Sequence, residues 1–293
     1  MTERRLIDRL EFYITNVCNL TCSGCNRYNN YKFAGHWTWA EAEPILTQWA
    51  ERIEIRHPVI LGGEPLLNAD IVSWINGIRR LWPRLSGVQI QSNGTRLDLV
   101  PGLYEALEPD QGNWIGISLH SAEHQEPLFE RIQNFLKPPI KITQDPNDRI
   151  GSRWQFIDAH QRKVHVWAND TFVNSNIIEL ANGRYGLYNS DPDLAHENCT
   201  FRRFKNYHMI RGRIYKCGPV ALMPEFDQQY QFDISAQDRE LLHSHRGLGV
   251  DEFDTRGQEF LDNIDNVIPQ CKFCPENYEY KPITFSTLKP NKI

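Results

Sequence analysis

The sequence has little that would direct the protein to a membrane or to nucleic acid. No stretch of its 293 residues approaches the ~18 consecutive apolar residues of a membrane-spanning helix. No long run of Lys or Arg is present to follow a phosphate backbone, and the net charge is -5. The segment Met1–Arg5 is not an apolar signal segment. We therefore expect a cytoplasmic protein that binds neither membranes nor nucleic acid.

The sequence also lacks a cysteine set that could close completely into disulfides, because its seven cysteines are an odd number. Two common phosphate-binding motifs, G-x-G-x-x-G and the P-loop, are absent. What the chain does have is 40% hydrophobic and 24% charged residues, which suits a soluble protein with a substantial core. Its length suits one large domain or one domain plus a smaller one. In the cytoplasm the thiols stay reduced and available to bind metal.

Three of the cysteines stand close together. Cys18, Cys22 and Cys25 form a C-x3-C-x2-C run after the first apolar segment. Soft thiolate ligands suit iron, and three of them can hold three corners of a cubic iron–sulfur cluster. Electron carriers and structural zinc sites generally use four protein ligands. The run therefore predicts chemistry at an open iron, although the cysteines alone could also form a zinc or redox site.

A second motif follows the next apolar segment. Gly62-Gly63-Glu64-Pro65 comes directly after Val59-Ile60-Leu61. Together with C-x3-C-x2-C it resembles the pattern of radical S-adenosylmethionine (SAM) enzymes, over roughly the first 180 residues. The resemblance implies a [4Fe–4S] cluster whose open iron chelates SAM and cleaves it to a 5′-deoxyadenosyl radical, which abstracts hydrogen from a substrate. It also implies an external one-electron reductant such as flavodoxin or ferredoxin.

The same resemblance implies a set of SAM-binding residues at the ends of the predicted strands. These are Gly62, Gly63, Glu64, Pro65, Ser92, Asn93, Ser118 and His120. From the residues alone, Ser92 and Asn93 are equally consistent with a turn cap, and His120 with a packed core histidine. The position before the last cysteine is often aromatic in the family, but here it is Gly24. Contacts to adenine would then come from elsewhere, with Tyr28 and Tyr13 as candidates.

Strand-like and helix-like segments alternate through the first half of the chain. The predicted strands are residues 10–15, 59–61, 88–91, 114–119, 164–167 and 177–180. Two helices are predicted after their caps, one after the Thr38/Glu41 capping box and one after Asp70. A third is predicted over residues 99–107, and a fourth contains the apolar positions Leu128, Ile132 and Phe135. This alternation predicts parallel βαβ units and an α/β fold. The family resemblance implies a partial (β/α)6 TIM barrel. We place this core at residues 1–185 and a smaller domain at residues 186–293.

The other cysteines form a second group: Cys199, Cys217, Cys271 and Cys274. Alternating residues around Gly212 predict a β-hairpin over residues 207–216, which would bring Cys199 and Cys217 together. Four thiolates fill a coordination shell, and a zinc site remains an alternative. The spacing resembles the twitch extension of radical SAM enzymes, a hairpin plus helix with an auxiliary [4Fe–4S] cluster, and is similar to the aminocyclitol dehydrogenase of butirosin biosynthesis. Two [4Fe–4S] clusters are therefore expected.

Two clusters would use every cysteine, so none would remain to return a hydrogen atom to a substrate radical. We therefore expect a dehydrogenase-like oxidoreductase whose auxiliary cluster accepts an electron. The candidates for its base are His208, Glu225, Lys216 and Arg153, although such residues are more often ordinary surface or structural residues than a catalytic base. Because Cys18 is near the N-terminus, we expect no leader-binding domain and a small polar substrate such as a sugar, aminocyclitol or nucleotide sugar. The alternatives are radical crosslinking or epimerisation of a peptide, and a non-catalytic iron–sulfur or zinc protein.

Overall fold

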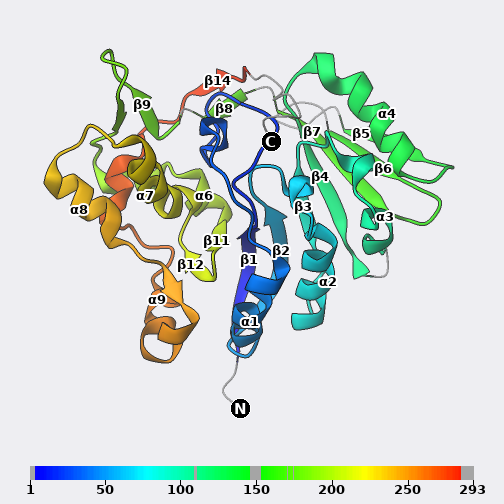
Figure 1. The fold of residues 1–293 in the computed structure, drawn as a ribbon, viewed down its shortest axis with the longest axis horizontal. Coiled ribbons are helices and arrows are strands. Elements are labelled where there is room, and N and C mark those ends of the chain that lie inside the picture. The colour runs from blue at the N-terminus through cyan, green and yellow to red at the C-terminus, as the bar shows by residue number, and fades with distance from the viewer. Residues whose placement is uncertain (1–3, 109–110, 146–152, 170, 174, 285–293) are drawn as a thin grey trace.

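The fold is organised by one large sheet. The computed structural model describes residues 4–108, 111–145, 153–169, 171–173 and 175–284. The strands of this sheet are β1 (Arg5–Tyr13), β2 (Ile53–Leu61), β3 (Gln89–Ser92), β4 (Trp114–Leu119), β5 (Lys141–Asp145), β6 (Arg153–Ile157), β7 (Lys163–Ala168), β11 (Tyr207–Ile210), β12 (Arg213–Tyr215) and β13 (Leu248–Gly249). Their order is β13-β12-β11-β1-β2-β3-β4-β7-β6-β5, and Figure 1 shows β1 near the middle.

The centre of the sheet is parallel and its edges are antiparallel. Six consecutive strands of the sheet pair in parallel with one another, as βαβ units require: β11, β1, β2, β3, β4 and β7. The α/β class and a mostly parallel sheet are therefore confirmed. The predicted strand at 114–119 matches β4, while the predicted strand at 59–61 is the buried end of the longer β2.

The sixth parallel strand is not the one that the sequence indicated. Residues 177–180 were expected in the barrel, but β9 (Ile177–Glu179) instead pairs antiparallel with β10 (Tyr185–Leu187) in a separate two-stranded sheet. The turn at Asn182-Gly183 reverses the chain at once, so β9 pairs with its neighbour in sequence. β11, from the C-terminal part of the chain, takes the sixth parallel position beside β1.

Helices cover the first strands on one face. They are α1 (Trp39–Ala50), α2 (Ile71–Leu81), α3 (Leu103–Ala106) and α4 (Gln125–Phe135). The capping box at the start of α1 is confirmed, and α1 continues through Pro44. The expected cap at Asp70 is wrong in its target, because the Asp70 carboxylate accepts a hydrogen bond from the Trp39 amide, 2.9 Å away, at the start of α1. The stretch predicted as one helix over 99–107 contains only the short α3.

The C-terminal part adds the helices α5 (Pro192–Glu197), α6 (Thr200–Phe204), α7 (Gly218–Tyr230), α8 (Ala236–Ser244) and α9 (Gln258–Asp262), and the 3-10 helix η8 (Pro269–Phe273). Figure 1 shows α7, α8 and α9 on one side of β1 and α4 beyond β4 on the other. The predicted hairpin over 207–216 is confirmed as β11 and β12 with a turn at Arg211-Gly212. The hairpin lies after the predicted domain boundary at residue 185, yet its strands belong to the main sheet. The division into two domains stays a prediction.

The alternation of side chains along β1 separates the core from the site. Phe12 points to the helices, where its ring lies 6.3 Å from that of Trp74 and 5.9 Å from that of Trp82. Arg9 and Glu11 lie on the opposite face of the strand, toward a cavity. β1 therefore carries both the apolar core and charged groups. None of the helices in the described ranges is long and apolar enough to cross a membrane.

Candidate active site

The three N-terminal cysteines open onto one cavity of about 340 Å³. Cys18, Cys22 and Cys25 lie on the loop after β1, at the end of the sheet where parallel-barrel enzymes place their sites. Six of the eight predicted SAM-binding residues line the same cavity: Gly62, Gly63, Ser92, Asn93, Ser118 and His120. The structure therefore brings together residues from the ends of β1, β2, β3 and β4.

Gly62 and Gly63 are required by close packing against the cysteine loop. A Cβ atom at Gly62 would lie 2.5 Å from the carbonyl oxygen of Thr15. A Cβ atom at Gly63 would lie 2.3 Å from the carbonyl oxygen of Val17 and 3.0 Å from the Cβ of Cys18. The Gly63 amide donates to the Thr15 carbonyl at 2.8 Å. Side chains at these positions would push the loop away, so the glycines hold the cysteines against the end of β2.

Glu64 does not line the cavity but ties two strand ends together. Its fully buried carboxylate accepts hydrogen bonds from the Ser92 hydroxyl at 2.8 Å and from the amides of Asn93 and Leu66 at 2.7 and 3.0 Å. Burial raises the pKa of Glu64 to about 7, against the lowering effect of these donors. Glu64 therefore positions the neighbouring residues, and Pro65 is likewise buried away from the cavity.

The ends of β3 and β4 place amide and hydroxyl groups around the cysteines. The Asn93 side chain donates to Asn19 at 2.9 Å, and its Nδ2 lies 4.0 Å from the Cys18 sulfur. The Ser118 hydroxyl accepts from Gln91 at 3.1 Å. His120 donates from Nδ1 to the carbonyl of Asn169 at 3.0 Å, and burial lowers its pKa. A neutral imidazole is thus held at the cavity wall.

Sequence reasoning missed a charged cluster on the cavity floor. The buried Glu11 carboxylate lies 3.1 Å from the guanidinium groups of both Arg9 and Arg27, and 3.1 Å from Nε2 of the fully buried His208 on the adjacent strand. Burial alone would raise the pKa of Glu11, but His208, Arg27 and Arg9 outweigh it and hold the pKa at about 2. The available signal was Glu11, the one charged residue in the strand predicted over residues 10–15.

The four candidate bases do not meet in one place. His208 donates from Nδ1 to the Asn206 carbonyl at 3.0 Å and faces Glu11 with its other nitrogen. Glu225 on α7 is paired with Arg211 at 3.1 Å, and the buried Lys216 ammonium donates to the carbonyls of Ile264 and Asn266 at 2.9 and 2.6 Å. Arg153 on β6 lies over the Trp167 ring, 5.8 Å from its centroid.

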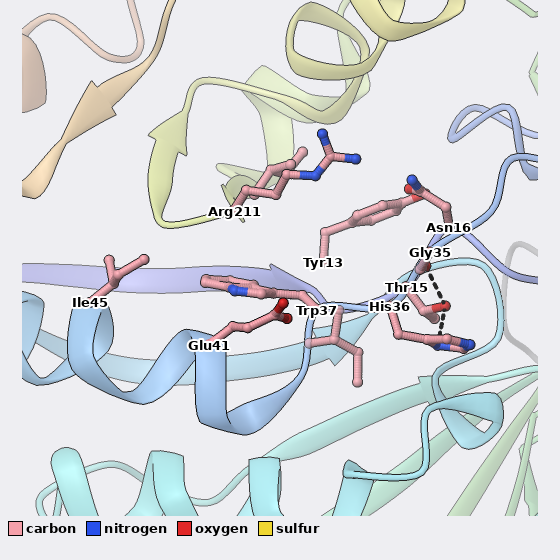
Figure 2. Close-up of a pocket in the computed structure, with 11 residues that line it drawn as sticks. Tyr13, Thr15, Asn16, Gly35, His36, Trp37, Glu41, Ile45 and Arg211 are labelled. Carbon is pink, nitrogen blue, oxygen red and sulfur yellow. Dashed lines mark hydrogen bonds between the residues drawn. The ribbon is translucent and has the colours of Figure 1, made fainter.

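The two tyrosines considered for adenine lie elsewhere than on the cavity wall. Tyr28 is buried with 1% of its surface exposed. Tyr13 lines a second pocket of about 360 Å³, between the start of α1 and the β11–β12 turn (Figure 2). Its hydroxyl accepts from the Asn29 side chain at 2.8 Å. Figure 2 shows Tyr13 beneath Arg211 and above Trp37, with no cysteine among the residues drawn.

The second group of cysteines comes from three different elements. Cys199 precedes α6, Cys217 precedes α7, Cys271 lies in η8 and Cys274 follows η8. Burial raises the pKa of Cys274 well above its usual range, and Cys217, Cys199 and Cys271 raise it further, so the four thiols are electrostatic neighbours. The Asn176 amide donates to the Cys274 sulfur at 2.8 Å.

Both cysteine groups suit a metal cluster by the chemistry of their donors. Burial raises the pKa of Cys18 and Cys22 to about 12, so a bound cation is needed to hold them as thiolates at neutral pH. Within the described ranges, no three His, Cys, Asp or Glu side chains are arranged around a single metal ion. A cubic cluster does not require that closeness, because it holds each thiolate on a separate iron.

Known proteins resemble this chain mainly over its first half. The model of the radical SAM superfamily matches residues 12–162, just over half of the 293 residues. The probable GTP 3′,8-cyclase of Methanocaldococcus jannaschii is 28% identical over 131 residues, which are 45% of this chain and 42% of that protein. The GTP 3′,8-cyclase of Petrotoga mobilis is 31% identical over 119 residues, 40% of this chain and 36% of that protein. The chain thus matches less than half the length of these curated relatives.

Solved structures show weaker similarity. Streptococcus suis SuiB has 24% identity and a TM-score of 0.32, over 42% of this chain and 26% of that protein. The anSMEcpe enzyme with bound AdoMet has 15% identity and a TM-score of 0.34, over 44% of this chain and 40% of that one. The family match runs from the end of β1 through β6 and includes the cysteine loop, the Gly62-Gly63 segment and most of the residues that line the cavity. This chain belongs to the radical SAM superfamily.

Proposed function

We propose that the protein uses the radical formed from SAM at the N-terminal cysteines to oxidise a small polar molecule. In this proposal an auxiliary [4Fe–4S] cluster at Cys199, Cys217, Cys271 and Cys274, in a twitch-type arrangement, accepts the second electron. The observation that supports it is that Cys199, Cys217 and Cys271 each act electrostatically on Cys274, although the four come from three separate elements. With the N-terminal three, they account for all seven cysteines.

The cavity favours a small polar substrate. Apart from the cysteines, its wall carries the guanidinium groups of Arg9 and Arg27 beside the Glu11 carboxylate. Amide side chains surround them: Asn26, Asn29, Asn30, Gln91, Asn93, Asn169 and Asn206. Such groups can hydrogen bond hydroxyl, amine or phosphate groups while contributing little apolar surface. A sugar, an aminocyclitol or a nucleotide sugar matches this lining.

The chain's own residues would bind and orient the two molecules. Gly62 and Gly63 let the cysteine loop pack against the end of β2 beside the cavity, and Asn93 and Ser118 present polar groups on the cavity wall. Oxidation of a secondary alcohol to a ketone removes a hydrogen atom, a proton and an electron. SAM and the N-terminal cluster would supply the radical that takes the hydrogen atom, and the auxiliary cluster would take the electron. The proton would leave through the polar cavity lining.

A second candidate is ring closure on a purine nucleotide. It is favoured by the relatives, whose names describe GTP 3′,8-cyclases. The two arginines in the cavity are compatible with a phosphorylated substrate. Product mass separates the candidates, because oxidation of an alcohol removes two hydrogens, whereas ring closure within one molecule conserves the mass. Epimerisation, a peptide-modifying alternative, also conserves the mass and is recognised by the peptide nature of its substrate.

The deciding experiment measures iron, sulfide and zinc after anaerobic reconstitution. Wild type is compared with the Cys18→Ala/Cys22→Ala/Cys25→Ala variant. Two cubic clusters predict about eight irons per chain, falling to about four in the variant. About four irons falling to none, with roughly one zinc retained, would identify the C-terminal group as a zinc site and remove the proposed electron acceptor.

A further inference from the structure

Tyr28 belongs by its backbone to the N-terminal cysteine loop. Its amide donates to the carbonyl of Cys25 at 3.0 Å. Its backbone is left-handed, with φ 60° and ψ 17°. Aromatic residues rarely adopt this conformation, because the Cβ atom crowds the backbone, and such strain is kept where the surroundings hold it in place. The turn therefore directs the Tyr28 ring inward at a cost in backbone energy.

The Tyr28 hydroxyl is buried without a protein partner. The residue is 1% exposed, and its ring packs edge-to-face against Phe226 of α7 with 5.9 Å between centroids. Within the described part of the chain, no group forms a hydrogen bond with this hydroxyl. A buried hydroxyl without a partner is unfavourable, and phenylalanine would fill the same space without that cost. An acceptor that the polypeptide does not supply would explain the hydroxyl.

The surroundings of the hydroxyl indicate where that acceptor lies. Burial raises the pKa of Tyr28 well above its usual range, and Cys274, Cys217 and Cys25 raise it further, in that order. Cys274 and Cys217 therefore act more strongly on the pKa of this hydroxyl than Cys25 on its own loop does. Cys217 directly precedes α7, the helix that carries Phe226. The hydroxyl stays protonated and can act only as a donor toward a negatively charged sulfur.

Resting on the proposed auxiliary cluster, we infer that the Tyr28 hydroxyl donates a hydrogen bond to a sulfur of that cluster and raises its reduction potential. Hydrogen bonds to the sulfurs stabilise the more negative, reduced state of an iron–sulfur cluster. The C-terminal site already takes one such donor, the Asn176 amide on Cys274 at 2.8 Å. Tyr28 would make this cluster a better electron acceptor and link its potential to the loop that binds the other cluster.

The test compares Tyr28→Phe with Tyr230→Phe, a matched control from the same aromatic cluster. The Tyr230 ring lies 4.7 Å from that of Phe226, but its hydroxyl donates to the Tyr31 carbonyl at 2.6 Å. Each substitution is made in two versions of the full chain. One version keeps all seven cysteines, and in the other Cys18, Cys22 and Cys25 are replaced by Ala. Iron and sulfide are measured first, and the potential of the remaining cluster follows from an anaerobic titration monitored by electron paramagnetic resonance.

We expect Tyr28→Phe to keep its iron and to shift the cluster potential to a more negative value, while Tyr230→Phe leaves the potential unchanged. As a second variant, 3-fluorotyrosine at position 28 is a stronger donor and should shift the potential in the opposite direction. Equal potentials in wild type, Tyr28→Phe and the fluorinated protein would overturn the inference. Absence of C-terminal iron in wild type would overturn the proposed function itself, before any Tyr28 variant is compared.

Discussion

The two cysteine sites differ in how the chain builds them. The N-terminal three cysteines lie within one loop of eight residues. Two close-packed glycines and the buried Glu64 contact the chain just before that loop. The C-terminal four come from three separate elements, between positions 199 and 274. The distances among these four thiols depend on how the hairpin, α7 and η8 pack against one another. The first site is therefore mainly local, whereas the second depends on tertiary packing.

The largest expected effect separates the chemistry of the two sites. Replacing Cys18, Cys22 and Cys25 by Ala should abolish reductive cleavage of SAM, because no ligands for the open-iron cluster remain. Replacing Cys271 and Cys274 by Ala should leave that cleavage in place, because the cavity does not include them. Formation of 5′-deoxyadenosine, measured by mass spectrometry with a chemical reductant, checks both. Equal loss in the two variants would show that the sites are not independent.

Glu11→Gln tests the charged floor beneath the N-terminal site. Removing one partner of a buried ionic cluster should cost roughly 3–5 kcal/mol of unfolding free energy. Because the pKa of Glu11 is held at about 2 in the fold, its ionic contribution is complete above its unfolded pKa. It is lost as the pH falls from about 4.5 toward 2. The difference between wild-type and variant apoprotein in urea unfolding should therefore shrink between pH 5 and pH 3 (roughly the titration window of a carboxylate).

The exposed pair of Asp8 and Arg56, also involving β1, is the control for this experiment. Their oxygen and nitrogen atoms are 2.6 Å apart, but both side chains are more than half exposed. Asp8→Asn should change the unfolding free energy by only about 0–1 kcal/mol. A Glu11→Gln effect as small as that of Asp8→Asn would contradict a buried ionic cluster.

Lys216→Ala tests the packing on which the C-terminal site depends. It removes two hydrogen bonds from a buried ammonium to the carbonyls of Ile264 and Asn266. We expect the free energy of unfolding to fall by roughly 3 kcal/mol. We also expect less iron at the C-terminal site and unchanged iron at the N-terminal site. Thermal unfolding and iron content measure the two effects. Lys205→Ala is the control, because its ion pair with Asp265 is on the surface. Iron lost equally from both sites would argue against a local role.

Glu225→Gln should have the smallest effect. Glu225 is held by Arg211, whose side chain is 63% exposed, and an ion pair of that kind contributes about 0–1 kcal/mol. Burial raises the pKa of Glu225, which lowers the cost of making it neutral. Cleavage of SAM and product formation should both be retained in the variant. Loss of product with intact SAM cleavage would instead identify Glu225 as the base.

Local patterns predicted local structure well. The strand at 114–119, the capping box at Thr38 and the hairpin at Gly212 all depend on neighbouring residues, and all are present. The target of the Asp70 cap and the partner of β1 at the sixth position were predicted wrongly. Both depend on which elements pack together, and single-sequence periodicity does not contain that information. The antiparallel edge of β5 and β6 was missed for the same reason.

The sequence by itself determined the family and predicted Cys18, Cys22 and Cys25 as the ligands of the N-terminal site. The close packing of Gly62 and Gly63 against the cysteine loop is seen only in the structure. Ligand spacing within one short loop limits how far the thiols can separate, so the motif carries its geometry with it. Only the tertiary structure decided that Glu11 meets His208, Arg9 and Arg27. It also decided that the Tyr28 hydroxyl is buried without a hydrogen-bond partner in the described part of the chain, where Cys274, Cys217 and Cys25 all raise its pKa. These contacts join residues far apart in the chain, and their positions follow from burial of apolar faces rather than from local spacing.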